Sequence, residues 1–238
     1  MPEWWSYTLS DFLLFSPRTY YRLLERYNEA VWPAHLVTLG LGLLVLELLR
    51  RRIARWQGPA IFFILALVWS WISWAFFWKR YASINWAAVY FLLMSTLQVL
   101  LLAWHGVFRR RLTFQVTSGA AQVTGITLFL FSLFCYPALA LLAGRSWHQS
   151  EVFGITPDPT AIGTAGLTLL VGHRVPASLL VVPVLWCLVS GLTLYAMKSP
   201  EAWVPPLAAG LAAAFSRLPG RNQDTRDEHS KGRKPGPT

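Results

Sequence analysis

The residues best suited to binding or proton transfer lie at the start of one apolar run, residues 153–172, which two prolines interrupt. Its sequence is FGITPDPTAIGTAGLTLLVG. Asp158 stands between two prolines. About 20 apolar residues are needed to cross a bilayer core, and roughly half that number occupy 161–171. Proline-broken backbone is tolerated at membrane depth only against protein or water. We therefore expect the run either to be re-entrant or to cross with its polar side chains turned inward: Thr156, Asp158, Thr160 and Thr164.

The Asp158 carboxylate allows two interpretations. As an N-cap, it would accept hydrogen bonds from backbone N–H groups near Ala161 in a helix that begins at Pro159. Alternatively, it faces a cavity at the outer membrane surface and binds a cation or shuttles a proton, as acids within membranes often do. A carboxylate favours hard cations over soft ones.

Two further apolar runs, 86–104 and 119–143, contain polar side chains that need partners inside a bundle. They are Ser95, Gln98, Gln122, Thr124 and Thr127. These side chains either link helices or line a polar pathway. The predicted substrate- or ion-binding set is Asp158, Thr156, Thr160, Gln98 and Gln122.

Glu47 is the only other acid within an apolar run. Arg50 and Arg51 follow it by three and four residues, which favours an ion pair at the level of the lipid headgroups. If Glu47 faced the bundle instead, it would form the inner end of a proton path.

Signatures of metal sites, haem sites and enzymes are weak. The histidines are His35, His105, His148, His173 and His229. Their positions give little support to haem ligation. Cys135 and Cys187 lack CxxC spacing, which predicts two buried apolar side chains rather than a zinc site. Because no G-x-S-x-G, H-E-x-x-H or Walker pattern occurs, the sequence predicts no catalytic or metal-binding residue and favours a protein that is not an enzyme.

The composition indicates a membrane protein. Of 238 residues, 55% are hydrophobic and only 13% are charged, and the mean hydropathy is +0.42. The net charge of +10 comes from lysines and arginines at the ends of apolar runs, where they meet lipid headgroups. The expected partners are therefore the bilayer, other membrane subunits or a second copy of the chain, and not nucleic acid.

The apolar runs predict an all-α transmembrane bundle of six to seven spans within residues 32–217. The runs are 32–49, 59–77, 86–104, 119–143 with a kink at Pro137, 161–171, 176–197 and 203–215. Residues 218–238 are charged, rich in Gly and Pro and free of aromatic residues, which predicts a disordered basic cytoplasmic tail. If seven segments cross, 14 of the 21 basic residues lie on the side of the C-terminus, so the positive-inside rule predicts a periplasmic N-terminus.

Residues 1–31 form a predicted N-terminal interfacial segment. They have neither a basic start nor a cleavage site of the kind that marks a signal peptide. Ser16 and Pro17 are typical of an N-cap and a first helical residue, so we expect a helix from Pro17 to about Glu29. Its apolar stripe, which we expect to lie on the membrane plane, consists of Tyr20, Leu23, Leu24 and Tyr27.

Several short motifs occur together across residues 9–215. They are Tyr27-Asn28, Trp32-Pro33, a Trp-rich second span, Ile84-Asn85, a third span that holds Gln98 and ends in RRRLTF, Tyr136-Pro137, FGITPDPT and VPASLLVVPVLW. This combination resembles the bacterial membrane family called domain of unknown function 6064, which implies its fold and a loose permease label. The family usually has a cysteine where Asp158 stands, and a histidine near Ala75 and Phe76, so a thiol-based role does not transfer.

We therefore expect a small permease-like or channel-like protein of the bacterial inner membrane, because transporters place broken, polar backbone at their binding sites. No internal inverted repeat is evident, so it would work as an oligomer or as a simple facilitator. The alternative is an accessory or structural subunit docked on a larger respiratory or photosynthetic complex. Its contact surfaces would be the Trp-rich second span and the interfacial helix.

Overall fold

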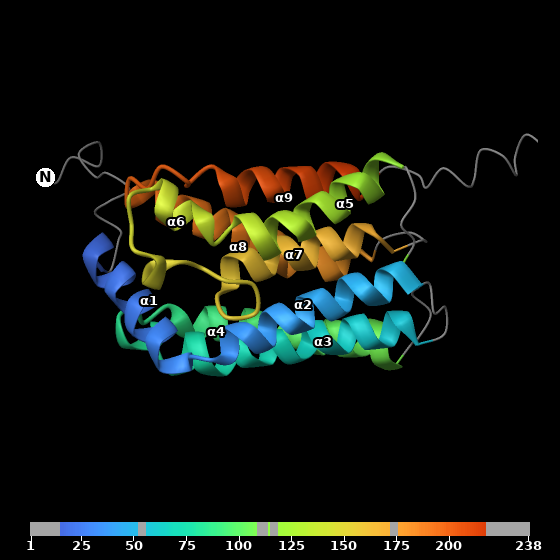
Figure 1. The fold of residues 1–238 in the computed structure, drawn as a ribbon, viewed down its shortest axis with the longest axis horizontal. Coiled ribbons are helices and arrows are strands. Elements are labelled where there is room, and N and C mark those ends of the chain that lie inside the picture. The colour runs from blue at the N-terminus through green and yellow to red at the C-terminus, as the bar shows by residue number, and fades with distance from the viewer. Residues whose placement is uncertain (1–14, 52–55, 109–113, 115–118, 172–175, 218–238) are drawn as a thin grey trace, which may run out of the picture.

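The computed structural model describes residues 15–51, 56–108, 114, 119–171 and 176–217, and it forms a bundle of helices (Figure 1). Within these ranges the only β-structure is two isolated bridges. The predicted tail, 218–238, and the first 14 residues lie outside the described part. The α-helices are α1 (Pro17–Val31), α2 (Ala34–Arg51), α3 (Gln57–Trp71), α4 (Ala88–Leu102), α5 (Ala120–Leu130), α6 (Ala138–Leu142), α7 (Pro157–Leu169), α8 (Ala177–Ala196) and α9 (Val204–Phe215).

Three of the α-helices are followed directly by a π-helical segment. The segment η3 (Ile72–Trp78) extends α3, η5 (Ala103–Phe108) extends α4, and η6 (Phe131–Cys135) follows α5. After η6 a turn at Tyr136 and Pro137 interrupts the helix before α6 begins, at the position of the predicted kink. A proline removes a backbone donor and crowds the preceding turn, which accounts for the break.

The helices α2, α3 and α4 lie on one side of the bundle, and α5, α6 and α9 lie on the other, with α7 and α8 between them (Figure 1). The helix α1 crosses one end of the bundle, and its axis makes an angle of 84° with that of α2. We call this the α1 end. The opposite end brings together α2 with α3, through Gln57 and Leu48, and η5 with α8, through His105 and Ser178.

The predicted helix at residues 17–29 is confirmed and runs on to Val31. The Ser16 hydroxyl accepts a hydrogen bond from the Thr19 N–H, and Pro17 is the first helical residue. Its apolar stripe is almost completely buried against the rest of the chain. The stripe therefore packs against protein, which corrects the expectation that it lies on the membrane plane. The reason is that the segment between α6 and α7 packs against this face of α1.

All 13 residues of α7 are buried, polar side chains included. A helix of this length spans about 20 Å, well short of the roughly 30 Å of a bilayer core. The helix begins part-way along the bundle and runs towards the opposite end, where Val171 bridges Phe114 (Figure 1). At its crossing with α5, a Cβ on Gly166 would come within 2.6 Å of the Gly125 carbonyl oxygen. Glycine is required there because the two backbones touch.

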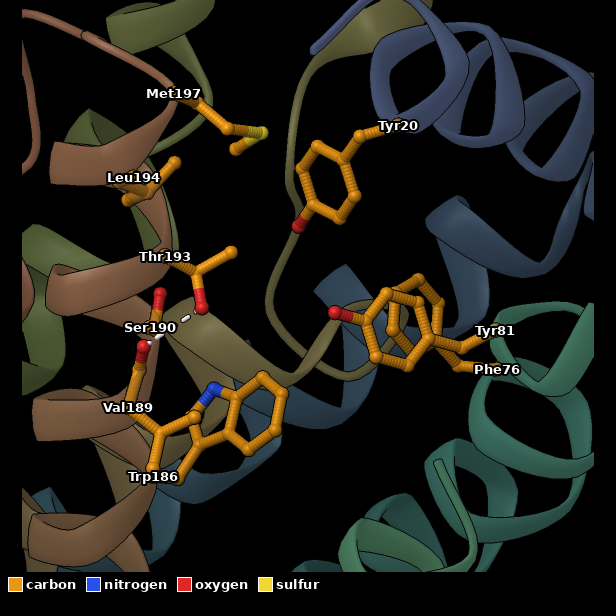
Figure 2. A pocket seen from close by; sticks show the side chains of 9 residues that line it. All are labelled: Tyr20, Phe76, Tyr81, Trp186, Val189, Ser190, Thr193, Leu194 and Met197. Atoms are coloured by element: carbon orange, nitrogen blue, oxygen red, sulfur yellow. Dashed lines mark hydrogen bonds between the residues drawn. The ribbon is translucent and has the colours of Figure 1, made fainter. Parts of the chain in front are cut away.

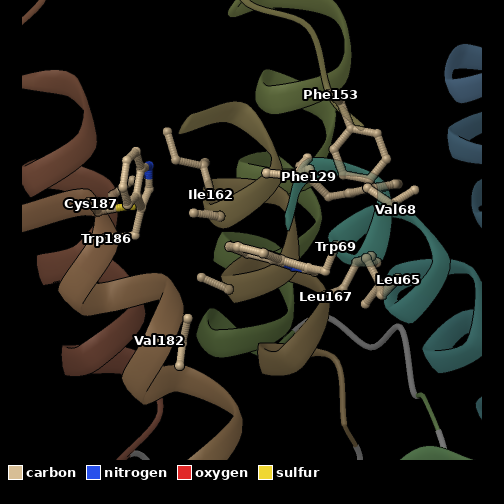
Figure 3. Close-up of a cluster of buried hydrophobic side chains, with 14 of the residues drawn as sticks. Leu65, Val68, Trp69, Phe129, Phe153, Ile162, Leu167, Val182, Trp186 and Cys187 are labelled. Carbon is tan, nitrogen blue, oxygen red and sulfur yellow. The ribbon is translucent and has the colours of Figure 1, made fainter. Parts of the chain in front are cut away.

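The core around α7 is built from α3, α5 and α8 (Figure 3). Trp69 of α3 is 1% exposed, and its indole N–H donates to the Thr164 hydroxyl of α7 at 2.9 Å. Trp69 therefore packs in the bundle, while Trp74 lies on its surface. Of the two cysteines expected to be buried, Cys187 is buried, but Cys135 is exposed because it lies on the outer face of η6.

By length and composition, three helices could cross a membrane: Gln57–Ser83, Ala88–Gly106 and Ala177–Ala196. A fourth is possible if the bent pair α1 and α2 forms one span. Two further apolar helices, Ala120–Cys135 and Val204–Phe215, are shorter. The all-α prediction is confirmed for the described residues.

Candidate functional site

The segment that leads into α7 is buried from Ser150 onward, except for the half-buried Val152, without belonging to a helix. Side chains supply the hydrogen bonds that its backbone lacks. Thr160 accepts from the Gly154 N–H at 2.8 Å, and Thr156 accepts from the Val152 N–H at 3.0 Å. This satisfies the requirement that a buried backbone group find a partner.

Two residues of α1 complete this arrangement. The Asn28 amide donates to the carbonyl oxygens of His148 and Ser150, each at 2.8 Å. The Tyr27 hydroxyl donates to the carbonyl oxygen of Ile155 at 3.2 Å. The Tyr27-Asn28 pair therefore has a structural role, because it holds the broken backbone that precedes α7.

Asp158 lies in the first turn of α7 and is 1% exposed. Three donors from outside α7 converge on its carboxylate. The Trp186 indole N–H donates to Oδ1 at 2.7 Å, the Tyr136 hydroxyl donates to Oδ2 at 3.0 Å, and the Ser190 hydroxyl also donates to Oδ2. Trp186 and Ser190 are one turn apart on α8, and Tyr136 precedes α6. The carboxylate thus joins three segments of the bundle.

This geometry corrects the N-cap interpretation of Asp158. The helix begins at Pro157 rather than Pro159, and its N-cap residue is Thr156. The Asp158 side chain points away from the α7 backbone and bonds α8 and Tyr136 instead. Its position in the first turn still suits a negative charge, because a helix N-terminus carries a partial positive charge.

The two kinds of donor differ in what they permit. An indole N–H can only donate, so Oδ1 remains an acceptor. A hydroxyl can donate or accept, so Tyr136 and Ser190 can adapt to a proton on Oδ2. None of the ion pairs between described residues includes Asp158. The site can therefore hold the carboxyl group in either protonation state with its hydrogen bonds satisfied.

The other predicted site residues are distributed along the bundle. Thr156 and Thr160 lie beside Asp158 and support the backbone. Gln98 of α4 is fully buried and donates to the Leu179 carbonyl oxygen at 3.2 Å, about two helical turns from Trp186 along α8. Gln122 is half-buried near the start of α5. The structure brings together the two threonines and Asp158, and leaves the two glutamines apart from them.

The buried polar side chains of α4 serve as links between helices rather than as the lining of a pathway. Ser95 of α4 accepts from Ser73 of η3 at 2.8 Å, and Gln98 links α4 to α8. Thr127 of α5 is exposed on the surface of the bundle. Of the two interpretations of these residues, the contacts of Ser95 and Gln98 therefore favour the first.

The sequence did not single out a second group of buried charged residues at the α1 end. Glu151 is 6% exposed and Glu201 is 7% exposed, and Arg145 forms an ion pair with Glu201. The Tyr20 hydroxyl donates to Glu151 Oε1 at 3.3 Å. Burial raises the pKa of the Glu151 carboxyl well above its ordinary value of 4.5, the nearby Asp158 carboxylate raises it further, and Arg145 opposes the shift.

A small cavity separates these two groups of residues. Its volume is about 10 Å³, close to the space of one water molecule. Tyr20 lines it from α1, and Trp186, Ser190 and Thr193 line it from α8 (Figure 2). The cavity therefore lies between the donor to Glu151 and two of the donors to Asp158.

The remaining candidates have ordinary partners. Glu47 bonds Arg50 at 2.8 Å and also pairs with Arg51, which confirms the ion-pair interpretation. His35 is within 3.2 Å of the Asn28 side chain, and His105 is within 3.1 Å of Ser178. In the described part of the chain, no three His, Cys, Asp or Glu residues are placed to hold a metal ion.

Part of this site could have been found from the sequence. Tyr136 and Trp186 both stand in the motifs that carry the family resemblance, but nothing in their spacing assigns them to Asp158. Ser190 and Glu151 carry no motif. Their convergence depends on how α8 and the segment before α7 cross, which only the three-dimensional fold specifies.

Comparison with known proteins places the chain in a family. No curated protein and no solved structure matches it. A family model described as Family of unknown function (DUF6064) matches residues 18–225, which include every residue of the site described above. The chain belongs to this family.

Proposed function

We propose that the chain is a multi-pass protein of the bacterial inner membrane, with six to seven spans, a periplasmic N-terminus and a cytoplasmic C-terminus. The three long apolar helices support this proposal. So do tryptophans that are exposed near both ends of the helices, where such side chains meet the lipid interface. They are Trp32, Trp78, Trp86, Trp147 and Trp203 at the α1 end and Trp56 and Trp104 at the opposite end.

The path of the chain supports the count of seven segments. The helices α2, α3, α4, α5 with α6, and α8 run between the two ends of the bundle, and the 12-residue helix α9 runs beside them for part of that length (Figure 1). The turn at 152–156, in which the Val152 carbonyl oxygen accepts from the N–H groups of Ile155 and Thr156, and the helix α7 together make one further passage along the bundle. Glu151 precedes this passage at the α1 end. Such a passage is tolerated in a membrane because its backbone is buried in protein.

We propose that the protein is permease-like or channel-like and that Asp158 binds and releases a proton during its cycle. The carrying observation is a carboxylate that is 1% exposed, has no cationic partner among the ion pairs of the described residues, and is bonded by two hydroxyls that can donate or accept. A buried charge without a cation is costly, and a bound proton removes that cost. The buried non-helical backbone that leads into α7 at this point is typical of transporter sites.

The size of the cavity favours a proton over a larger cargo. Pockets for small organic ligands measure about 300–1,000 Å³. The cavity next to Asp158 measures about 10 Å³. Thr156 and Thr160 are engaged by the backbone, so in this conformation they offer no further ligands to a substrate.

Proton flux in liposomes tests this proposal. The purified protein is reconstituted with a pH-sensitive dye inside the vesicles, and a potassium diffusion potential drives protons inward. Asp158→Asn keeps the shape of the side chain and removes its titration, so we expect proton flux to fall about a hundredfold. Glu47→Gln is the matched control and should conduct like the wild type. A wild-type flux in Asp158→Asn refutes the proposal.

The second candidate function is an accessory subunit of a larger membrane complex. It is favoured by α4, whose span is mostly exposed and presents apolar side chains along one face. Purification in mild detergent tests it. A stoichiometric partner that is lost when Leu93 and Leu97 are both replaced by alanine would support the subunit, and an unaccompanied chain that conducts protons would refute it.

A further inference from the structure

A proton site needs a route to one face of the protein, and Glu151 has the properties of the next group along such a route. It is 6% exposed, and its Oε2 has no hydrogen-bond partner among the described residues. Its Oε1 accepts from the Tyr20 hydroxyl at 3.3 Å. A buried carboxylate with an unpaired oxygen is costly as an anion, and a proton on that group relieves the cost.

The cavity connects this carboxylate with the first one. Tyr20 and Ser190 both line it, and each is bonded to a different acid: Tyr20 to Glu151, and Ser190 to Asp158. In Figure 2 the Tyr20 hydroxyl lies across the cavity from the Ser190 and Thr193 side chains. One water molecule in a cavity of about 10 Å³ would complete a chain of hydroxyl groups between the two carboxyls.

We propose that Glu151 is the group through which Asp158 exchanges its proton with the α1 end, by way of Ser190, the cavity and Tyr20. This inference rests on the proposed function of Asp158 as a proton site. It assigns a role to Glu151 and Tyr20, neither of which belongs to the predicted site.

The transfer balances at each oxygen. The O–H bond at Asp158 Oδ2 breaks, and its proton passes to the Ser190 oxygen, while Ser190 gives its own proton to the cavity water. The water gives a proton to the Tyr20 oxygen, and the Tyr20 hydroxyl gives its original proton to Glu151 Oε1. Every intermediate oxygen gains one proton and loses one. Asp158 ends as a carboxylate and Glu151 as a neutral acid.

The charges around Glu151 support the sharing of a proton. The charged groups that influence it are the carboxylates of Asp158 and Glu201 and the guanidinium of Arg145, and the phenols are Tyr20, Tyr21, Tyr81 and Tyr136. Arg145 is already paired with Glu201 and lies 4.2 Å from the centre of the Tyr21 ring. The one cation that influences Glu151 is thus already paired with another carboxylate, so ionisation of Asp158 favours a proton on Glu151.

Infrared spectroscopy after a pH jump tests the route on the full-length protein in lipid nanodiscs. The C=O band of protonated Asp158 is assigned by its loss in Asp158→Asn. In Glu151→Gln we expect the band to keep its amplitude and its rate of protonation to fall about a hundredfold, as when a positioned proton-transfer group is removed. Glu151→Asp should recover part of the rate. The control is Glu29→Gln, which alters an exposed acid on the same helix as Tyr20.

Tyr20→Phe provides a second variant that keeps the ring packing and removes only the hydroxyl, so it decides the matter if Glu151→Gln fails to fold. It should slow protonation of Asp158 in the same way. Wild-type rates in either folded variant would overturn the route and leave the proton site at Asp158 intact. Absence of a titrating Asp158 band in the wild type would overturn both the route and the proposed function.

Discussion

The carboxyl groups at the two ends of the bundle have opposite surroundings. At the opposite end, Glu47 has a side chain that is 35% exposed and is paired with two exposed arginines. Glu151 and Glu201 at the α1 end, and Asp158 further along the bundle, are all buried, and of these three acids only Glu201 forms an ion pair among the described residues, with Arg145. An exposed ion pair contributes little because water screens both partners. A buried acid without a cation of its own is costly as an anion, and a bound proton removes that cost, which suits a group that takes up protons.

Of these buried and exposed acids, Asp158 is the one whose substitution we expect to change stability most. Asp158→Ala removes the acceptor of Trp186, Tyr136 and Ser190 at once and leaves buried donors unpaired. We expect the free energy of unfolding, measured by titration with denaturing detergent in mixed micelles, to fall by about 3 kcal/mol. Asp158→Asn keeps an oxygen for Trp186 and offers N–H groups to two hydroxyls that can accept, so its loss should stay within about 1 kcal/mol.

Equal losses for the alanine and asparagine variants would contradict this account. They would mean that the negative charge itself, and not the set of hydrogen bonds, holds α7 in place. The helix N-terminus would then be the main stabilising partner of Asp158.

The second prediction concerns the backbone that positions Asp158. A Cβ at Gly166 of α7 would lie 2.6 Å from the Gly125 carbonyl oxygen, and neither backbone can yield easily. We expect Gly166→Ala to destabilise the protein by about 1–3 kcal/mol, as overpacked cores do. Gly40→Ala is the control, since a Cβ there meets nothing within 4 Å, and it should stabilise α2 by about 0.5 kcal/mol or more.

Both glycine variants are measured by the same mixed-micelle titration. If Gly166→Ala were neutral, α5 and α7 would have room to separate, and the fixed geometry inferred for Asp158 would be in doubt. If both variants changed the free energy of unfolding by the same amount, the close crossing would have no energetic weight.

Sequence reasoning located α7 and its broken entry because the hydrophobic pattern and the prolines act locally. Ser16 and Pro17 likewise determine where α1 begins, by local capping. The partners of Asp158 could not be deduced, because Tyr136, Trp186 and Ser190 reach it only through the crossing of α7 with α8 and η6. The same limit explains the error for the stripe of α1: amphipathicity shows that a face will be buried, but not whether lipid or protein covers it.

The third prediction concerns how the free energy of unfolding depends on pH through Glu151 at the α1 end. In the unfolded chain Glu151 loses its proton near pH 4.5, but in the folded protein burial and Asp158 hold its pKa well above that value. The folded state binds more protons in this window, so stability is fully present below pH 4.5 and falls as the pH rises through the raised pKa, by about 1.4 kcal/mol per pH unit. Glu151→Gln should remove this fall, so the variant becomes more stable than the wild type as the pH rises.

Unfolding midpoints measured from pH 4 to 8 for the wild type, Glu151→Gln and the exposed control Glu29→Gln test the sign. Parallel curves for all three proteins would show that Glu151 is ionised with little penalty in the folded state. It would then belong with Glu47 in the comparison rather than with Asp158.

The smallest effect is expected at Glu47, where a substitution without any measurable effect would itself be informative. Glu47→Gln breaks two exposed ion pairs, with Arg50 and Arg51, that water and headgroups already screen. We expect no measurable change in the unfolding midpoint or in proton flux, and no change in orientation, since the positive-inside rule counts basic residues. Were Glu47 the inner end of a proton path, its removal would cut the flux as severely as Asp158→Asn. The ratio of these two fluxes therefore measures whether proton exchange depends on the buried acids alone.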